Sequence, residues 1–92
     1  MSVLVRFSPQ GLTVEQHDDV TRRLTDAGHW PPEGLEYHVC FGDPGDMRVS
    51  EIWSSMEQCQ AFGEHLMPIL DQVGVTMAAP PEALEVHDQQ RF

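Results

Sequence analysis

Few side chains of this chain could do acid–base chemistry, and the best placed are His38 and Glu51. Residues 35–41 alternate between apolar and polar types, a second strand-like run covers residues 47–54, and the turn-forming segment 42–46 separates the two runs. Alternation on both sides of a glycine-rich turn predicts a β-hairpin. A histidine and a carboxylate on neighbouring strands of a hairpin can act together as a general base.

The register of this hairpin decides whether His38 and Glu51 meet. We expect the register that keeps apolar residues of both strands on one face, because a shift by one residue would mix the faces. It pairs Phe41 with Arg48, His38 with Glu51, and Glu36 with Trp53. In this register Glu51 is a second candidate catalytic residue that orients His38. The alternative is a structural pair that only fixes the hairpin.

The expected register divides the hairpin into two faces, and we expect the more apolar face to pack against helices. Its members are Leu35, Tyr37, Val39, Phe41, Ser50 and Ile52. The other, uncovered face holds Glu36, His38, Cys40, Val49, Glu51 and Trp53. Polar groups gathered around an aromatic ring are typical of a small-molecule pocket, so we expect the site on the uncovered face.

Four more residues are candidates for binding a substrate on the uncovered face. The alternation of residues 3–8 predicts a strand that points Arg6 there, where its guanidinium could bind an acidic group. Trp53 could stack on a planar ligand. Cys40 and His87 share the same expected face, with Leu84 and Val86 pointing toward the helices. Three of these candidates also have a structural alternative: ion pairing with Glu51 or Glu85 for Arg6, packing in the dimer core for Trp53, and burial for Cys40.

Two helices should position these strands. Residues 13–28 open with the capping-box residues Thr13 and Gln16 and carry a helical apolar stripe. A serine pair caps a longer helix that ends at Gly74, and Pro68 should kink or interrupt it. The histidines in or beside the helices are expected at surface or edge positions, and they are His17, His29 and His65. Trp30 either covers the mouth of the pocket or anchors its loop.

The order of elements, β-α-β-β-α-β, predicts one α+β domain over residues 1–92 with the ferredoxin-like fold. Right-handed crossovers place both helices on one face of a four-stranded antiparallel sheet. A chain of this length buries only about 60–65% of its unfolded surface. A second copy is the simplest cover for the other face, so we expect a homodimer.

Composition excludes several classes of function. Five Lys plus Arg against fifteen Asp plus Glu give a net charge of −10, which argues against nucleic acid and anionic membranes as partners. The sequence contains no Lys, which excludes Schiff-base chemistry and a P-loop. Two cysteines make no disulfide framework, and no apolar run is long enough to span a membrane. We expect a soluble, cytoplasmic protein. The lack of Lys and Asn points to a high-GC bacterial genome.

Several short runs, taken in order, resemble a known family. They are Phe7-x-Pro9-x-Gly11-Leu12-Thr13-x-Glu15-Gln16, Pro32-x-Gly34-Leu35-x-x-His38-Val39, Val49-x-Glu51-Ile52-Trp53-x-Ser55, Gly74-Val75 and Val86-His87. Over almost its whole length the chain is similar to small bacterial proteins of the dimeric α/β-barrel superfamily, related to the antibiotic-biosynthesis monooxygenases. The resemblance implies that two sheets pair into a barrel with a pocket in each half. The chain departs from the family pattern at His17, where the pattern has Tyr, and in having no Asn.

The resemblance and the polar cluster lead to one hypothesis for function. The chain binds a small aromatic or polyketide-like compound and, if it is an enzyme, acts as a cofactor-independent monooxygenase. In this hypothesis His38 moves a proton, Glu51 orients His38, Arg6 holds an acidic group and Trp53 stacks on the ring. The alternatives are a polyketide-cyclase-like enzyme and a non-catalytic ligand-binding or structural dimer.

Haem or metal binding through His38 or His87 is a further alternative. Together with Glu51 these residues have the ligand types of a facial-triad site. Their separation in the sequence gives no metal-ligand spacing, so we predict no metal site and no cofactor.

Overall fold

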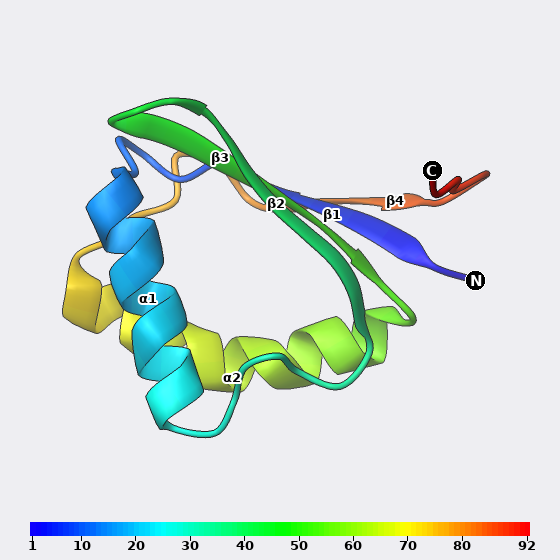
Figure 1. The fold of residues 1–92 in the computed structure, drawn as a ribbon, viewed down its shortest axis with the longest axis horizontal. Helices are drawn as coiled ribbons and strands as arrows, with labels where there is room; N and C mark the ends of the chain where they lie inside the picture. The colour runs from blue at the N-terminus through cyan, green and yellow to red at the C-terminus, as the bar shows by residue number, and fades with distance from the viewer.

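The computed structural model describes residues 1–92 and contains six elements. They are β1 (Val3–Phe7), α1 (Val14–Asp26), β2 (Leu35–Asp43), β3 (Asp46–Trp53), α2 (Met56–Val73) and β4 (Glu82–Glu85). The strands form one antiparallel sheet in the order β2-β3-β1-β4, and α1 and α2 both lie on one side of it (Figure 1). This arrangement confirms the predicted ferredoxin-like fold.

Side-chain caps begin both helices. Thr13 and Gln16 form the predicted capping box, in which each side chain accepts a hydrogen bond from the other residue's backbone N–H, at 3.1 and 3.0 Å. Of the two candidate serines, Ser55 caps α2. Gly74 ends α2 with φ 85°, a left-handed conformation that glycine adopts without strain.

The predicted interruption of the second helix at Pro68 is wrong. α2 is assigned without a break from Met56 to Val73. Pro68 lacks the N–H that would bond to the Glu64 carbonyl, but both residues are exposed, so water can satisfy that carbonyl.

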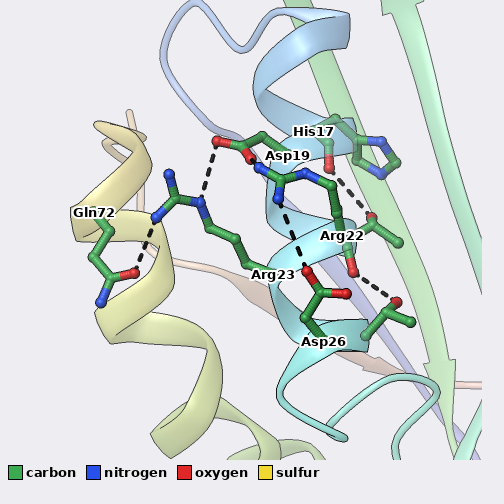
Figure 2. A network of polar contacts seen from close by, with 8 residues as sticks. His17, Asp19, Arg22, Arg23, Asp26 and Gln72 are labelled. Atoms are coloured by element: carbon green, nitrogen blue, oxygen red, sulfur yellow. Dashed lines mark hydrogen bonds and ion pairs between the residues drawn. The ribbon is translucent and has the colours of Figure 1, made fainter.

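A set of polar side chains ties α1 to α2 at the surface. Arg23 on α1 donates to Asp19 one turn earlier and to Gln72 on α2, both at 3.2 Å, and Figure 2 shows it reaching across between the helices. Arg22 pairs with Asp19 and, at 3.9 Å, with Asp26. The Arg23 hydrogen bond holds the pKa of Asp19 below its usual range.

The hairpin register is confirmed over most of its length. His38 lies opposite Glu51 and Phe41 lies opposite Arg48. The start of β2 differs, because an irregularity between Leu35 and Tyr37 places Leu35, rather than Glu36, opposite Trp53. Glu36 therefore has no partner residue on β3. Its carboxylate accepts hydrogen bonds from the hydroxyls of Ser2 and Ser54, both at 2.8 Å.

The predicted assignment of faces to the hairpin is wrong. Trp53 is fully buried in the core that includes Leu24 of α1 and Phe62 of α2, so His38, Cys40 and Glu51, which share its side of the hairpin, lie on the face covered by the helices. Tyr37 and Phe41, predicted to face the helices, are 50% and 40% exposed. We call the covered side the helix face and the other side the outer face.

The edge strands divide in the same way. On β1 the prediction is confirmed: Val5 is 2% exposed in the core, and its neighbour Arg6 is on the outer face. On β4 the prediction is wrong, because Leu84 pairs with Leu4 on the outer face and is 47% exposed. No helix of the chain is both long and apolar enough to cross a membrane.

Candidate functional site

An apolar cavity of about 70 Å³ lies between the helices and the sheet. Eleven of its sixteen lining residues are hydrophobic. Its polar lining includes His17 from α1, His38 from β2 and Glu51 from β3. The cavity thus combines a mainly apolar wall with a few convergent polar groups, which is the usual composition of a small-molecule site.

Glu51 is the polar centre of this site. Its side chain is 5% exposed, and each of its two carboxylate oxygens accepts one hydrogen bond. The donors are His38 Nδ1, at 2.7 Å, and the indole Nε1 of Trp53, at 3.1 Å. A buried carboxylate is costly unless it is paired in this way, so the two donors are what allow a charge to stay at this position.

His17 extends the pair into a chain of contacts. Its Nε2 lies 3.0 Å from Nε2 of His38, with the ring planes 25° apart and the ring centroids 5.3 Å apart. The two nitrogens therefore point at each other along the line that joins the rings. At the other side of His17, Nδ1 lies 3.3 Å from the exposed carboxylate of Asp18.

The pattern of donors and acceptors assigns the protons in this chain. Because Glu51 only accepts, His38 carries its proton on Nδ1, and its Nε2 accepts from Nε2–H of His17. The contact with Asp18 is favourable only when His17 also has a proton on Nδ1. His17 therefore connects the Glu51–His38 pair to an exposed carboxylate next to solvent.

The position of His17 corrects the prediction of a surface or edge histidine, because its side chain is only 22% exposed. A sequence signal for this was present. His17 lies three residues before Val20 and seven before Leu24, the two buried residues of α1. That spacing places all three on one face of a helix.

Trp30 covers one side of the cavity, as one of the two predictions for it proposed. Its ring stands edge-on to His38, with centroids 5.1 Å apart, and is tilted against Phe62 of α2 at 6.1 Å. An aromatic wall thus lies directly over the imidazole of His38.

The other predicted site residues lie elsewhere. Arg6 projects from the outer face and pairs with Glu82 at 3.5 Å, so the sheet separates it from His38. His87 is exposed beyond the end of β4. Neither contributes to the cavity, and no three His, Cys, Asp or Glu side chains cluster as metal ligands would.

The two thiols are half-buried and free. Cys40 lies on the helix face but does not line the cavity, and burial raises its pKa. Burial also raises the pKa of Cys59 to about 11, with a further contribution from the charge of Glu51. Thiols in this state are poor nucleophiles at neutral pH.

No family model and no curated protein matches the chain, but solved structures do. A structural-genomics protein named YJCS matches with a TM-score of 0.68 at 10% identity, covering 95% of this chain and 100% of the other. A candidate antibiotic biosynthesis monooxygenase from Deinococcus radiodurans gives 0.61 at 13% identity, covering 100% and 98%. SnoaB, a cofactor-independent oxygenase from Streptomyces nogalater, gives 0.59 at 15% identity, covering 96% and 93%.

These likenesses establish the class of fold. The chain is a ferredoxin-like domain of the form found in antibiotic-biosynthesis-monooxygenase-like structures, matched over nearly its full length. At identities of this size the likeness concerns the fold, and the chemistry has to be argued from the cavity.

Proposed function

We propose that this chain is a small, cofactor-independent oxygenase that acts on an aromatic or polyketide-like compound. The observation that supports it best is the buried Glu51–His38 pair at the polar part of an apolar cavity. A carboxylate on Nδ1 fixes the imidazole, and the lone pair on Nε2 can accept a proton once His17 no longer donates to it, which is the arrangement of a general base. The shared fold with SnoaB, described as a cofactor-independent oxygenase, supports the same reaction class.

The reaction begins with a proton transfer. An activated C–H or O–H of the substrate gives its proton to Nε2 of His38, after His17 has turned away from that nitrogen, and the electron pair stays on the ring. The electron-rich ring then reduces dioxygen, which is both oxidant and oxygen source. A CH₂ carbon becomes C=O, and the second oxygen atom leaves as hydroxide with the remaining hydrogen. The proton that was released to solvent converts this hydroxide to water.

His17 gives the abstracted proton a route to solvent. While turned away, His17 releases its Nε2 proton to solvent and keeps its Nδ1 proton toward Asp18, whose side chain is 72% exposed. On its return, the bare Nε2 of His17 takes the proton from Nε2 of His38 across the 3.0 Å contact, which restores the starting protonation of both rings. Nε2 of His38 is then again without a proton. The transfer uses only the side chains of His38, His17 and Asp18.

We also propose that the protein works as a homodimer in the bacterial cytoplasm. One residue from each strand forms an apolar row across the outer face, and the row is Tyr37, Ile52, Leu4 and Leu84. The two ends of the row, Tyr37 and Leu84, are 50% and 47% exposed, and exposed large hydrophobic residues on one face are a usual mark of an interface. A second copy would cover the row, and two free thiols suit a reducing compartment.

The proposal is tested by replacing the base. Oxygen uptake by the purified wild type is measured with anthrone and hydroxynaphthalenes, with His38→Gln as the variant and His87→Gln as the matched control. We expect the His38 variant to lose about 10²–10⁴-fold in kcat, the range typical of a lost general base. The control should keep wild-type rates.

Two results would contradict the proposal. Equal rates for His38→Gln and wild type would remove His38 from the chemistry. Ligand binding without oxygen uptake by the wild type would favour the alternative of a non-catalytic binding dimer, in which the Glu51–His38 pair only stabilises the hairpin.

A further inference from the structure

The cavity at His38 is too small for the ligand class that the proposed function requires. Its volume is about 70 Å³. Pockets that hold small organic ligands begin at about 300 Å³. A bound aromatic compound therefore needs additional space that is continuous with the cavity.

A second hollow adjoins the cavity. A groove of about 290 Å³ is lined by the loop between α1 and β2 and by one side of α2. Phe62 lines both the cavity and the groove. Trp30 lines the cavity, and its neighbours in the loop at positions 29 and 31–33 line the groove, so Phe62 and this loop lie between the two hollows. Together the volumes of the cavity and the groove match the lower end of ligand pockets.

The loop that carries Trp30 is held mainly at its ends. His29 donates its backbone N–H to Leu24, and Ser54 donates to the carbonyl of Gly34, both at 2.8 Å. Between these anchors, Trp30 and the residues at 31 and 33 make no backbone–backbone hydrogen bond. Figure 1 shows the loop passing beside α2 on its way from α1 to β2. Segments with so few backbone bonds open at low cost.

Glycines stand at both ends of the loop. Gly28 and Gly34 have φ values of 80° and 91°, in the left-handed region. A Cβ at Gly34 would also collide with the side chain of Gln58. The loop therefore depends on glycine to lie against α2, and the same two positions can absorb the backbone rotations of a hinge.

Between the hinges, ring contacts keep the loop closed. Trp30 stands edge-on to His38, and His29 stacks on His65 of α2 with centroids 3.9 Å apart and planes 16° apart. Both contacts join side chains rather than backbone. When the loop opens, the ring contact between Trp30 and His38 is lost. A ligand ring that takes the place of Trp30 against His38 would replace that contact.

We propose that Trp30 is a movable wall, and that its displacement joins the cavity and the groove into one substrate site. The ring of the ligand lies against His38, and its far end lies in the groove. The groove offers donors on His29, His65 and Gln58 and an acceptor on Glu33. A neutral amide-like or carbonyl group fits this set better than an anion, because the chain carries a net charge of −10.

The experiment compares two fluorescent probes, 2-naphthol and 6-hydroxy-2-naphthamide, which differ only in the polar group at the far end. We expect the wild type to bind the amide about tenfold more tightly, by the arithmetic of one added hydrogen bond to a polar group. The double variant His29→Ala/His65→Ala should lose that difference and still bind 2-naphthol. Stopped-flow fluorescence should show an association rate at least about tenfold higher for Trp30→Ala, with Trp30→Phe in between, because a gated site binds slowly.

Phe92→Ala, which removes a fully exposed aromatic ring at the C-terminus, is the matched control and should leave the association rates of both probes unchanged. Equal affinity of the two probes for the wild type, no saturable binding, or an unchanged rate in both Trp30 variants would overturn the proposal. The substrate-site proposal rests on the proposed function only for its chemistry. If the probe results are as expected and neither wild type nor variants consume oxygen, the movable wall stands and the oxygenase proposal fails. If the wild type consumes oxygen but the probe results differ from those expected, the oxygenase proposal stands and the movable wall fails.

Discussion

At the scale of a single residue, Glu51 is the polar centre of the candidate site. Its carboxylate is buried, and both of its oxygens are hydrogen-bonded to ring N–H groups, from His38 and Trp53. One residue thereby fixes the tautomer of the candidate base and satisfies an indole N–H that would otherwise be orphaned in the core.

Replacing Glu51 with Gln should lower the stability of the fold and change the tautomer of His38. An amide presents one acceptor where the carboxylate presents two, so one of the ring donors faces an NH₂ group and stays unsatisfied. We expect a loss of about 1–3 kcal/mol in the free energy of unfolding. Urea unfolding measures it, and ¹⁵N NMR should show that His38 no longer keeps its proton on Nδ1. Glu85→Gln, at an exposed position of β4, is the control. An unchanged tautomer in Glu51→Gln would contradict the assignment of protons.

At the residue scale the sequence predicted the Glu51–His38 pair, because alternation and turn chemistry determine a hairpin register. It did not predict the third member. His17 comes from a helix, and the helix stripe that contains it was read from its apolar residues alone. The role of a polar residue in such a stripe can be predicted only when its partner across the core is known. The hairpin register does not predict contacts between a helix and a sheet.

Helix α1 is the element that brings His17 to the sheet, and its surface contacts with α2 hold it there. Asp19 has a pKa lowered chiefly by the hydrogen bond from Arg23, with a smaller contribution from Arg22. Figure 2 shows that Arg23 contacts Gln72 of α2 at the same time. The position of the candidate site therefore depends on contacts at the far side of α1.

The stability that Asp19 contributes should depend on pH. Its pKa is lower in the folded chain than in the unfolded chain, so the contribution is complete above the unfolded value of about 3.9 and disappears as the pH falls through the folded value. Asp19→Asn should therefore lower Tm at neutral pH, and the difference from wild type should vanish in acid.

The control for Asp19 removes the same charge elsewhere. Asp71→Asn changes an exposed carboxylate on α2 that makes no side-chain ion pair. Because the Asp19 side chain is 29% exposed and pairs with two arginines at the surface, about 1 M salt should reduce its effect as well. A Tm difference that is the same at every pH would show that the contribution of Asp19 is not electrostatic.

At the element scale the order of helices and strands was predictable, but the unbroken course of α2 through Pro68 and the faces of the hairpin were not. The prediction counted apolar residues and assigned Tyr37 and Phe41 to the core. In the structure Trp53 lies in the core, and His38 and Glu51 lie on the same face of the hairpin, because Glu51 accepts hydrogen bonds from both ring N–H groups and so satisfies the polar atoms there. An outer face that a partner covers can be as apolar as a core face. A count of apolar residues then does not distinguish the two faces of the hairpin.

The whole molecule has a one-sided architecture, with helices on one face of the sheet and an apolar row on the other. In this row Tyr37 and Leu84 are 50% and 47% exposed. For a chain of this size, pairing of two outer faces would bury about 800 Å² on each partner, the usual area of a stable dimer.

A charge in this row should separate the dimer. We expect Tyr37→Asp to weaken association by about tenfold or more, because the new carboxylate would be buried unpaired twice per interface. Size-exclusion chromatography with light scattering over a range of concentrations measures the change. Met67→Asp adds the same charge at a position that is 54% exposed on α2, away from the sheet. A wild type that stays monomeric at high concentration would disprove the dimer.

The cavity is enclosed by one chain, on the side of the sheet that faces away from the expected partner, and this has a consequence for kinetics. A dimer built on the outer face would contain two complete sites with a sheet from each protomer between them. Such sites have no shared residue through which one could alter the affinity of the other, so substrate saturation should be hyperbolic. Mixed dimers of one wild-type and one His38→Gln protomer should then turn over at half the wild-type rate.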